Sequence, residues 1–273
     1  MAIGEIEKIT MTGAFDAFTV PQGCERAMVQ SRGDLPIATA PSLWLSARFP
    51  STLGFGTYPA VSSWADRSAN GFNASQALST KQPAYVRNAL NGRPALYFDS
   101  GDVLNLGNSN IWSNTYGLCI FAVIKSDPAS NGEIIAKYKT TGNLKEFHLF
   151  LNSADWGNNF WVVAETGSTH VALTVNTLTG LLTTACVITA RWKPGVEHTL
   201  YYNGLLKGTA VTAVDHISTG LTEELRIGSY EGGVSNYYDG YIGEIIAFPH
   251  GLTEAEQYAM EMYLGYNWGI RIP

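Results

Sequence analysis

Short apolar or alternating segments, each bounded by glycine, asparagine, aspartate or proline, follow one another along the chain from residue 43 onward. A period of two over a short segment is typical of a β-strand, whereas a helix needs a longer segment with apolar positions every three to four residues. Many strand-like segments with little helical pattern predict an all-β fold, an antiparallel sandwich rather than an α/β fold. The expected strands are residues 43–45, 95–98, 118–124, 147–151, 160–164, 186–192, 198–202, 205–209, 225–228 and 241–248.

One turn between two of these segments has a specific signature. Asn203 and Gly204 separate residues 198–202 from residues 205–209. A two-residue type I′ turn needs a positive φ at both central positions, and Asn-Gly adopts that conformation readily. The sequence therefore predicts a β-hairpin at residues 198–209.

A single helix is expected near the C-terminus. Thr253 and Glu256 have the spacing of a capping box, because the threonine hydroxyl can accept the Glu256 amide while the carboxylate reaches back. Apolar residues at helical spacing follow, so one amphipathic helix should pack on the sandwich before Trp268. The expected apolar stripe consists of Ala255, Tyr258, Ala259, Met262 and Tyr266.

The composition allows one large domain and excludes some partners. A chain of 273 residues, 45% of them hydrophobic, can bury a sizeable core. Its 17 Lys and Arg against 23 Asp and Glu give a net charge of -6 without a basic run, so we expect no nucleic acid partner. No segment approaches the about 18 consecutive apolar residues of a membrane span. The first residues lack a secretory signal, so we expect synthesis and retention in a cytoplasm until assembly or lysis.

The three cysteines do not form an obvious framework. Cys119 and Cys186 lie inside apolar segments and are expected to be small buried hydrophobic residues, while Cys24 stands apart. The sequence leaves open a disulfide between Cys119 and Cys186, but it requires neither a disulfide nor a metal site.

Residues 1–40 differ from the rest of the chain and are expected to form a separate arm. Two prolines bracket small residues at 36–41, as in linkers, so we place the domain at 41–273. Residues 15–20 and 27–31 could pair as a hairpin, which is too little to fold alone. Phe15, Phe18 and Val20 are the apolar anchors with which the arm could attach to a neighbour.

Several motifs occur in the order seen in a known family. They lie at residues 41–45, 61–74, 91–99, 200–204, 225–228, 240–246 and 267–270. Together they resemble laminin-G-like domains of the concanavalin A-like lectin and glucanase superfamily. The resemblance spans residues 41 to 271 and implies a concanavalin A-like jelly-roll sandwich of two packed curved sheets. Such domains include glycan binders, adhesion modules and many phage or bacterial surface proteins, so the resemblance specifies the fold better than the function.

The first functional hypothesis is a non-enzymatic virion protein, located on a capsid as a decoration protein or in a tail or fibre. In this hypothesis residues 1–40 attach the sandwich to other virion proteins by strand addition or apolar anchors, and a homo-oligomer is compatible with it. The alternative is a carbohydrate-binding module or lectin that recognises host-surface glycans. A polysaccharide-degrading enzyme ranks third.

Aromatic residues in loops are the candidates for glycan binding. A Trp or Tyr ring can stack on the apolar face of a sugar while neighbouring amides and carboxylates bond its hydroxyls. Core packing and subunit contact are the more frequent roles of such aromatics. The candidates are Trp112, Tyr116, Trp156, Asn158, Tyr237, Tyr238 and Asp239.

Metal and catalytic signals are weak. Asp66, Ser68 and Asn70 imitate the start of a calcium loop, but its closing position is Ala77, so turns at a strand corner are favoured and no cofactor is required. Asp99 and Asp102 are expected to lie in a solvated turn. No Glu begins the Glu-x-Asp-x-Glu pattern of glycoside hydrolases on this fold, and the histidines are scattered, so we expect no catalytic site.

Overall fold

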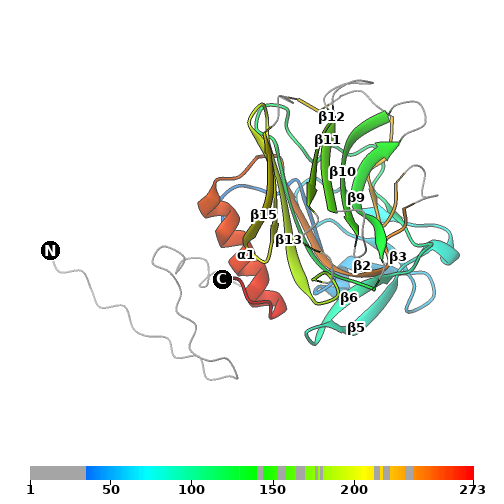
Figure 1. Cartoon of the computed structure of the whole chain (residues 1–273). Helices are drawn as coiled ribbons and strands as arrows, with labels where there is room; N and C mark the ends of the chain where they lie inside the picture. The colour runs from blue at the N-terminus through cyan, green and yellow to red at the C-terminus, as the bar shows by residue number, and fades with distance from the viewer. Residues whose placement is uncertain are drawn as a thin grey trace, which may run out of the picture.

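A computed structural model gives the arrangement of the chain. It describes residues 35–128, 130–139, 144–152, 158–163, 170–175, 178, 181–211, 216–217, 222–230 and 236–273. Within these residues, two antiparallel sheets face each other and α1 (Glu254–Trp268) lies beside one of them (Figure 1). None of the described helices is long and apolar enough to cross a membrane.

The sheet next to α1 is called sheet A. Its strands form the order β15-β14-β13-β8-β17-β6-β5, and β1 also pairs with β17. Their bounds are β1 Leu43–Ser46, β5 Ala84–Leu90, β6 Arg93–Phe98, β8 Leu118–Ser126, β13 Cys186–Lys193, β14 Glu197–Tyr202, β15 Leu205–Val211 and β17 Gly240–Phe248.

The opposite sheet is called sheet B and has the order β12-β11-β10-β9-β16-β7-β4-β3-β2. Several of its strands are very short, and two short 3-10 helices, η2 (Pro50–Thr52) and η3 (Ser79–Lys81), lie in its connections. The strand bounds are β2 Leu53–Phe55, β3 Val61–Trp64, β4 Ala74–Ser75, β7 Leu104–Asn105, β9 Asn131–Lys139, β10 Leu144–Asn152, β11 Asn158–Val163, β12 His170–Val175 and β16 Arg226–Ile227.

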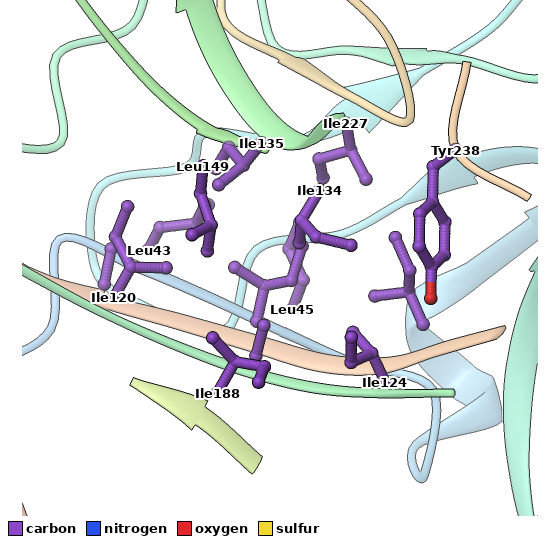
Figure 2. Close-up of a cluster of buried hydrophobic side chains, with 14 of the residues drawn as sticks. Leu43, Leu45, Ile120, Ile124, Ile134, Ile135, Leu149, Ile188, Ile227 and Tyr238 are labelled. Atoms are coloured by element: carbon purple, nitrogen blue, oxygen red, sulfur yellow. The ribbon is translucent and has the colours of Figure 1, made fainter. Parts of the chain in front are cut away.

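The central strand β8 shows why this sequence forms a sandwich. Its residues are apolar almost without interruption, which suits a strand covered on both faces. Ile120 and Ile124 point into the core between the sheets, whereas Phe121 points into a second cluster under α1. Figure 2 shows the main core, in which residues of sheet A face residues of sheet B. The labelled residues are Leu43, Leu45, Ile120, Ile124, Ile134, Ile135, Leu149, Ile188, Ile227 and Tyr238.

The local predictions at the hairpin and at the cysteines can be compared directly with the structure. Asn203 and Gly204 have φ values of 48° and 77°, which confirms the predicted turn between β14 and β15. Cys119 and Cys186 are both buried and free, and they point to opposite faces of sheet A. The disulfide that the sequence left open is therefore not formed.

Helix α1 begins as predicted but buries a different stripe. The capping box between Thr253 and Glu256 is present. Ala255 and Tyr266, which were expected to face the sandwich, are exposed. The reason is a polar contact between α1 and sheet A: Thr189 Oγ1 on β13 donates to Glu261 Oε1 at 2.7 Å, and Gln257 Nε2, one turn earlier on α1, donates to the same oxygen at 3.1 Å. Of the expected stripe only Met262 is buried, and the buried residues of α1 are Gln257, Met260, Glu261, Met262, Tyr263, Leu264, Gly265 and Trp268.

A buried carboxylate ties the first strand, the last strand and the helix together. Glu244 on β17 is fully buried and accepts hydrogen bonds from Trp44 Nε1 at 2.7 Å and Trp268 Nε1 at 2.6 Å. Burial raises the pKa of this carboxyl group above its ordinary value. Glu244 is therefore a structural residue, and the indole donors satisfy it inside the second cluster.

The described part of the chain begins in contact with this cluster. Leu35 and Ile37 pack against it, and Thr39 Oγ1 donates to Glu256 Oε1 at 2.9 Å. The attachment candidates Phe15, Phe18 and Val20 lie outside the described residues.

Candidate functional site

The face of sheet B that points away from the core is the candidate site. In the described residues, α1 packs on the outer face of sheet A, and no helix packs on the outer face of sheet B (Figure 1). Along β10, Phe147, Leu149 and Leu151 point into the core, so His148 and Phe150 point to the outer face. Polar and aromatic residues therefore gather on this face of sheet B, where Tyr138, His148 and Phe150 are buried.

A row of paired residues crosses this face. Asn105 on β7 pairs with Arg226 on β16, which pairs with Ala136 on β9, which in turn pairs with His148 on β10. Ser75 on β4 extends the row beyond Asn105. Directly paired residues of an antiparallel sheet share a face, so the row brings an amide, a guanidinium and an imidazole onto one surface.

His148 forms the centre of an aromatic and acidic cluster. Its Nδ1 lies 2.9 Å from Glu133 Oε1, its ring stacks on Tyr138 with centroids 4.8 Å apart, and Phe150 lies 6.3 Å away. The ring of Tyr230 meets Tyr138 edge-on at 5.5 Å. We call these five residues, Glu133, Tyr138, His148, Phe150 and Tyr230, the His148 cluster.

Glu133 has an unusual position in this cluster. Its side chain is completely buried although it belongs to the outer face, and its Oε2 has no hydrogen-bond partner among the described residues. A buried carboxylate oxygen without a donor is unfavourable, because it has lost its hydrogen bonds to water and has formed none with the protein. The cluster therefore has the capacity to accept one more hydrogen bond.

Arg226 is held beside the cluster by carboxylates. Glu223 forms an ion pair with its guanidinium, and Glu224 Oε2 accepts from Nη2 at 2.7 Å. Asn105 Nδ2 also donates to Glu224 Oε2, at 2.5 Å. Because Glu224 is half-exposed and fixed by two donors, it presents a positioned acceptor at the rim of the site.

A buried ion pair lies on the same two strands. Lys137 Nζ on β9 lies 3.2 Å from Glu146 Oε2 on β10 and donates to Asn110 Oδ1 at 2.6 Å. Burial raises the pKa of Glu146 to about 7 and lowers the pKa of Lys137, while their mutual attraction opposes both changes. The pair fixes the register of β9 on β10 rather than facing a ligand.

Two of the predicted glycan-binding residues are in the core. Trp112 is buried, with its ring edge-on to Phe147 at 5.6 Å and Lys137 Nζ 4.9 Å from its centroid. Tyr238 is fully buried, and its hydroxyl lies 3.1 Å from Ser126 Oγ. The expectation that both are loop aromatics open to a sugar is wrong, because the sandwich needs their large rings to fill the space between the sheets.

The other predicted residues are dispersed. Tyr116 is 61% exposed and stacks on His250 at 5.1 Å. Tyr237 is half-buried, with its hydroxyl 3.5 Å from Lys81 Nζ, and Asp239 lies 3.2 Å from the Tyr97 hydroxyl and accepts from Ser100. Trp156 lies outside the described residues, and Asn158 begins β11 with a side chain that lies outside them too.

The weak calcium candidates form a turn. Asp66 Oδ1 accepts from the amides of Trp44 and Ser68, and its Oδ2 accepts from the Ser68 hydroxyl and the Phe72 amide. The Asn70 side chain donates to the Ser42 carbonyl. These bonds confirm the predicted corner between strands. Among the described residues, no group of three or more His, Cys, Asp or Glu is arranged to hold a metal ion.

Asp99 and Asp102 also form a turn, but it differs from the prediction. Asp102 Oδ2 accepts the Asp99 amide at 3.0 Å, and Asp102 is buried rather than solvated. Burial raises the pKa of Asp102 to about 6.

No family model and no curated protein matches this sequence. Solved structures are similar in fold. Domain 4 of AbnA, a GH43 extracellular arabinanase from Geobacillus stearothermophilus in complex with arabinotriose, has a TM-score of 0.55 and 13% identity, covering 82% of this chain and 98% of that domain. The CBM40 of the Ruminococcus gnavus IT-sialidase, bound to α2,3-sialyllactose, has a TM-score of 0.51 and 17% identity, covering 61% and 96%.

A toxin domain is similar as well. The binding domain of Paraclostridial Mosquitocidal Protein 1 has a TM-score of 0.58 and 11% identity over 85% of this chain, which spans 55% of that domain. At such identities the likeness shows the fold alone: the chain is an all-β jelly-roll sandwich with one C-terminal helix, as the sequence predicted.

Proposed function

We propose that this protein is a carbohydrate-binding module whose ligand lies on the outer face of sheet B. The observation that carries the proposal is the His148 cluster, in which aromatic rings and a buried, incompletely bonded carboxylate meet on a face without a helical cover. Two of the similar domains were solved with saccharides, arabinotriose and sialyllactose, which supports this class of ligand. The virion role that the sequence suggested first has less support, and the proposal therefore favours the alternative.

Each residue type in the cluster has a role in such binding. Tyr230 is half-buried and offers a ring on which the apolar face of a sugar can stack. Glu224 and Asn105 at the rim are fixed by each other and can bond sugar hydroxyls. Glu133 is completely buried and does not face the sugar; its Oε1 lies 2.9 Å from His148 Nδ1 and holds that ring in place.

A glycan array with titration of its hits tests the proposal. We expect a saturable signal that Tyr230→Ala weakens at least about tenfold, or about 1.4 kcal/mol. Glu133→Gln retains the shape of this buried side chain but replaces one oxygen by a donor, so it should disturb the contact with His148 and weaken binding similarly. Tyr266→Ala is the matched control, because Tyr266 is 56% exposed on α1, on the side of sheet A. The absence of any saturable signal, or equal effects of Tyr230→Ala and Tyr266→Ala in folded proteins, would refute the proposal.

We also propose that binding occurs without cleavage. Glu133 is paired with His148, and Glu223 and Glu224 form ion pairs with Arg226. None of these groups has the arrangement of a proton donor opposite a second free carboxylate across a sugar bond. Incubation with each bound polysaccharide, followed by an assay for new reducing ends, should show no release above the level of buffer alone.

A further inference from the structure

A second group of polar and aromatic residues lies on the outer face of sheet A. Tyr97 on β6 pairs with Tyr241 on β17, which pairs with Lys125 on β8. The two tyrosine rings lie 4.9 Å apart and are tilted by 49°, and Lys125 Nζ is 5.6 Å from the centroid of Tyr241. All three side chains are only half-buried. Two adjacent aromatic rings are therefore accessible on this face.

Two aspartates and a serine border these rings. The Tyr97 hydroxyl lies 2.8 Å from Asp127 Oδ2 and 3.2 Å from Asp239 Oδ1. Ser100 Oγ donates to the other oxygen of Asp239 at 3.1 Å. We call Tyr97, Ser100, Asp127, Asp239 and Tyr241 the Tyr97 site.

The main chain holds the two carboxylates in place. The Asp127 amide donates to the Asp239 carbonyl at 3.0 Å, and the Asp239 amide donates to Ser130 Oγ at 3.1 Å. The carboxylates are thus positioned before any ligand arrives, which lowers the entropic cost of binding.

The Tyr97 hydroxyl cannot donate a hydrogen bond to both carboxylates. A phenol carries one proton, and the shorter distance directs it to Asp127. Asp239 Oδ1 then faces a phenolic oxygen that has no second proton to give. A ligand that brings hydroxyl donors would satisfy this oxygen, and a pair of aromatic rings beside it would take the apolar face of a sugar ring.

We propose that the Tyr97 site is a second saccharide-binding site, selective for neutral sugars. A sugar stacks against Tyr241 and Tyr97 and donates hydroxyl hydrogens to Asp239 and Asp127. Acidic sugars are disfavoured because Asp99 and Asp102 lie in the turn that carries Ser100 and add to the negative charge of the two site carboxylates. Lys125 Nζ lies over the Tyr241 ring of the site, and its positive charge offsets one of these negative charges.

This inference goes beyond the proposed function, because the Tyr97 site and the His148 cluster lie on opposite outer faces of the sandwich. A protein with both sites would be bivalent, and it could bridge two chains of a polysaccharide.

Isothermal titration of the full chain with arabinotriose, maltotriose, cellotriose and sialyllactose tests the inference. The variants are Tyr241→Ala, Asp239→Asn, Tyr230→Ala and the double variant Tyr230→Ala/Tyr241→Ala, with Tyr266→Ala as control. We expect at least one neutral trisaccharide to retain binding in Tyr230→Ala and to lose about tenfold or more in affinity in the double variant. Asp239→Asn should weaken the same binding, because it replaces an acceptor by a donor. Sialyllactose should bind the Tyr230→Ala variant at least about tenfold more weakly than the neutral sugar does.

The outcomes separate the two sites. Binding that Tyr230→Ala abolishes and Tyr241→Ala leaves unchanged would overturn the second site while supporting the proposed function. Binding that only Tyr241→Ala weakens would support the second site and overturn the first. Neutral-sugar binding at the Tyr97 site that disappears with a chelator would overturn direct recognition by the carboxylates, because a bound cation would then be the contact. A wild-type protein that binds none of the four sugars or array glycans would overturn both.

Discussion

The buried histidine of β14 allows a quantitative prediction about stability in acid. His198 pairs with Trp192 and Ala210, is completely buried in the sandwich, and is uncharged at neutral pH. Burial lowers its pKa from the ordinary value of 6.5 to about 4, because the imidazolium would lose its hydration. In the unfolded chain the same histidine titrates near its ordinary value.

The sign and size of the effect follow from this difference. Below pH 6.5 the unfolded state takes up a proton that the folded state rejects until about pH 4, so the free energy of unfolding falls across this range. At about 1.4 kcal/mol for each pKa unit, His198 should remove about 3 kcal/mol of stability between about pH 7 and pH 4. Asp102 and Glu146 act in the opposite direction, because burial raises their folded pKa values to about 6 and about 7. A single curve of unfolding free energy against pH would therefore not reveal the contribution of His198.

A comparison with His198→Phe isolates its contribution. Urea unfolding of both proteins at several pH values gives the free energy of unfolding, and the two carboxyl groups cancel in the difference. We expect the wild-type protein to lose about 3 kcal/mol more than the variant as the pH falls from about 7 to about 4. Parallel curves, differing by less than about 0.5 kcal/mol in this loss, would show that the histidine does not stay neutral in the core.

Three further predictions concern single features of the fold and its attachment. Thr253→Ala removes the capping box of α1 and should cost about 1 kcal/mol in urea unfolding, whereas Ser79→Ala, which removes no cap, should cost less than half of that. Gly132→Ala should lower the free energy of unfolding by about 1–3 kcal/mol, because a methyl group there would collide with the main chain of Tyr237. An unchanged urea midpoint would contradict this close approach. Deletion of residues 2–34 tests the virion hypothesis: the sandwich should fold, the hypothesis requires that it no longer join particles, and normal incorporation would reject attachment by the arm.

The sequence by itself determined the features that depend on neighbours along the chain. The Asn203-Gly204 turn and the Thr253 capping box follow from local conformation and local hydrogen bonds, and both are present. The long central strands were also recognisable, because β8 and β13 are buried on both faces and are apolar throughout.

Short or irregular strands were not predictable in this way. The segments β4 and β7 have two residues each, too few for any period to emerge, whereas the equally short β16 lies within the expected strand 225–228. In β9, Ile134 and Ile135 are consecutive yet both lie in the main core, because the pairing with β10 shifts at Leu149 and Phe150. The alternation of apolar and polar residues that marks a strand is lost at this point, so β9 could not be predicted from the sequence.

Only the tertiary structure decided which residues form the candidate site. Glu133 and His148 come from β9 and β10, and Tyr230 follows β16, far along the chain. A histidine that stands alone in the sequence acquires a carboxylate and a stacked tyrosine because antiparallel register, and not sequence spacing, sets which side chains share a sheet face. Trp112 and Tyr238 lie outside the strands, and packing placed them in the core, because the space between two sheets had to be filled by large side chains.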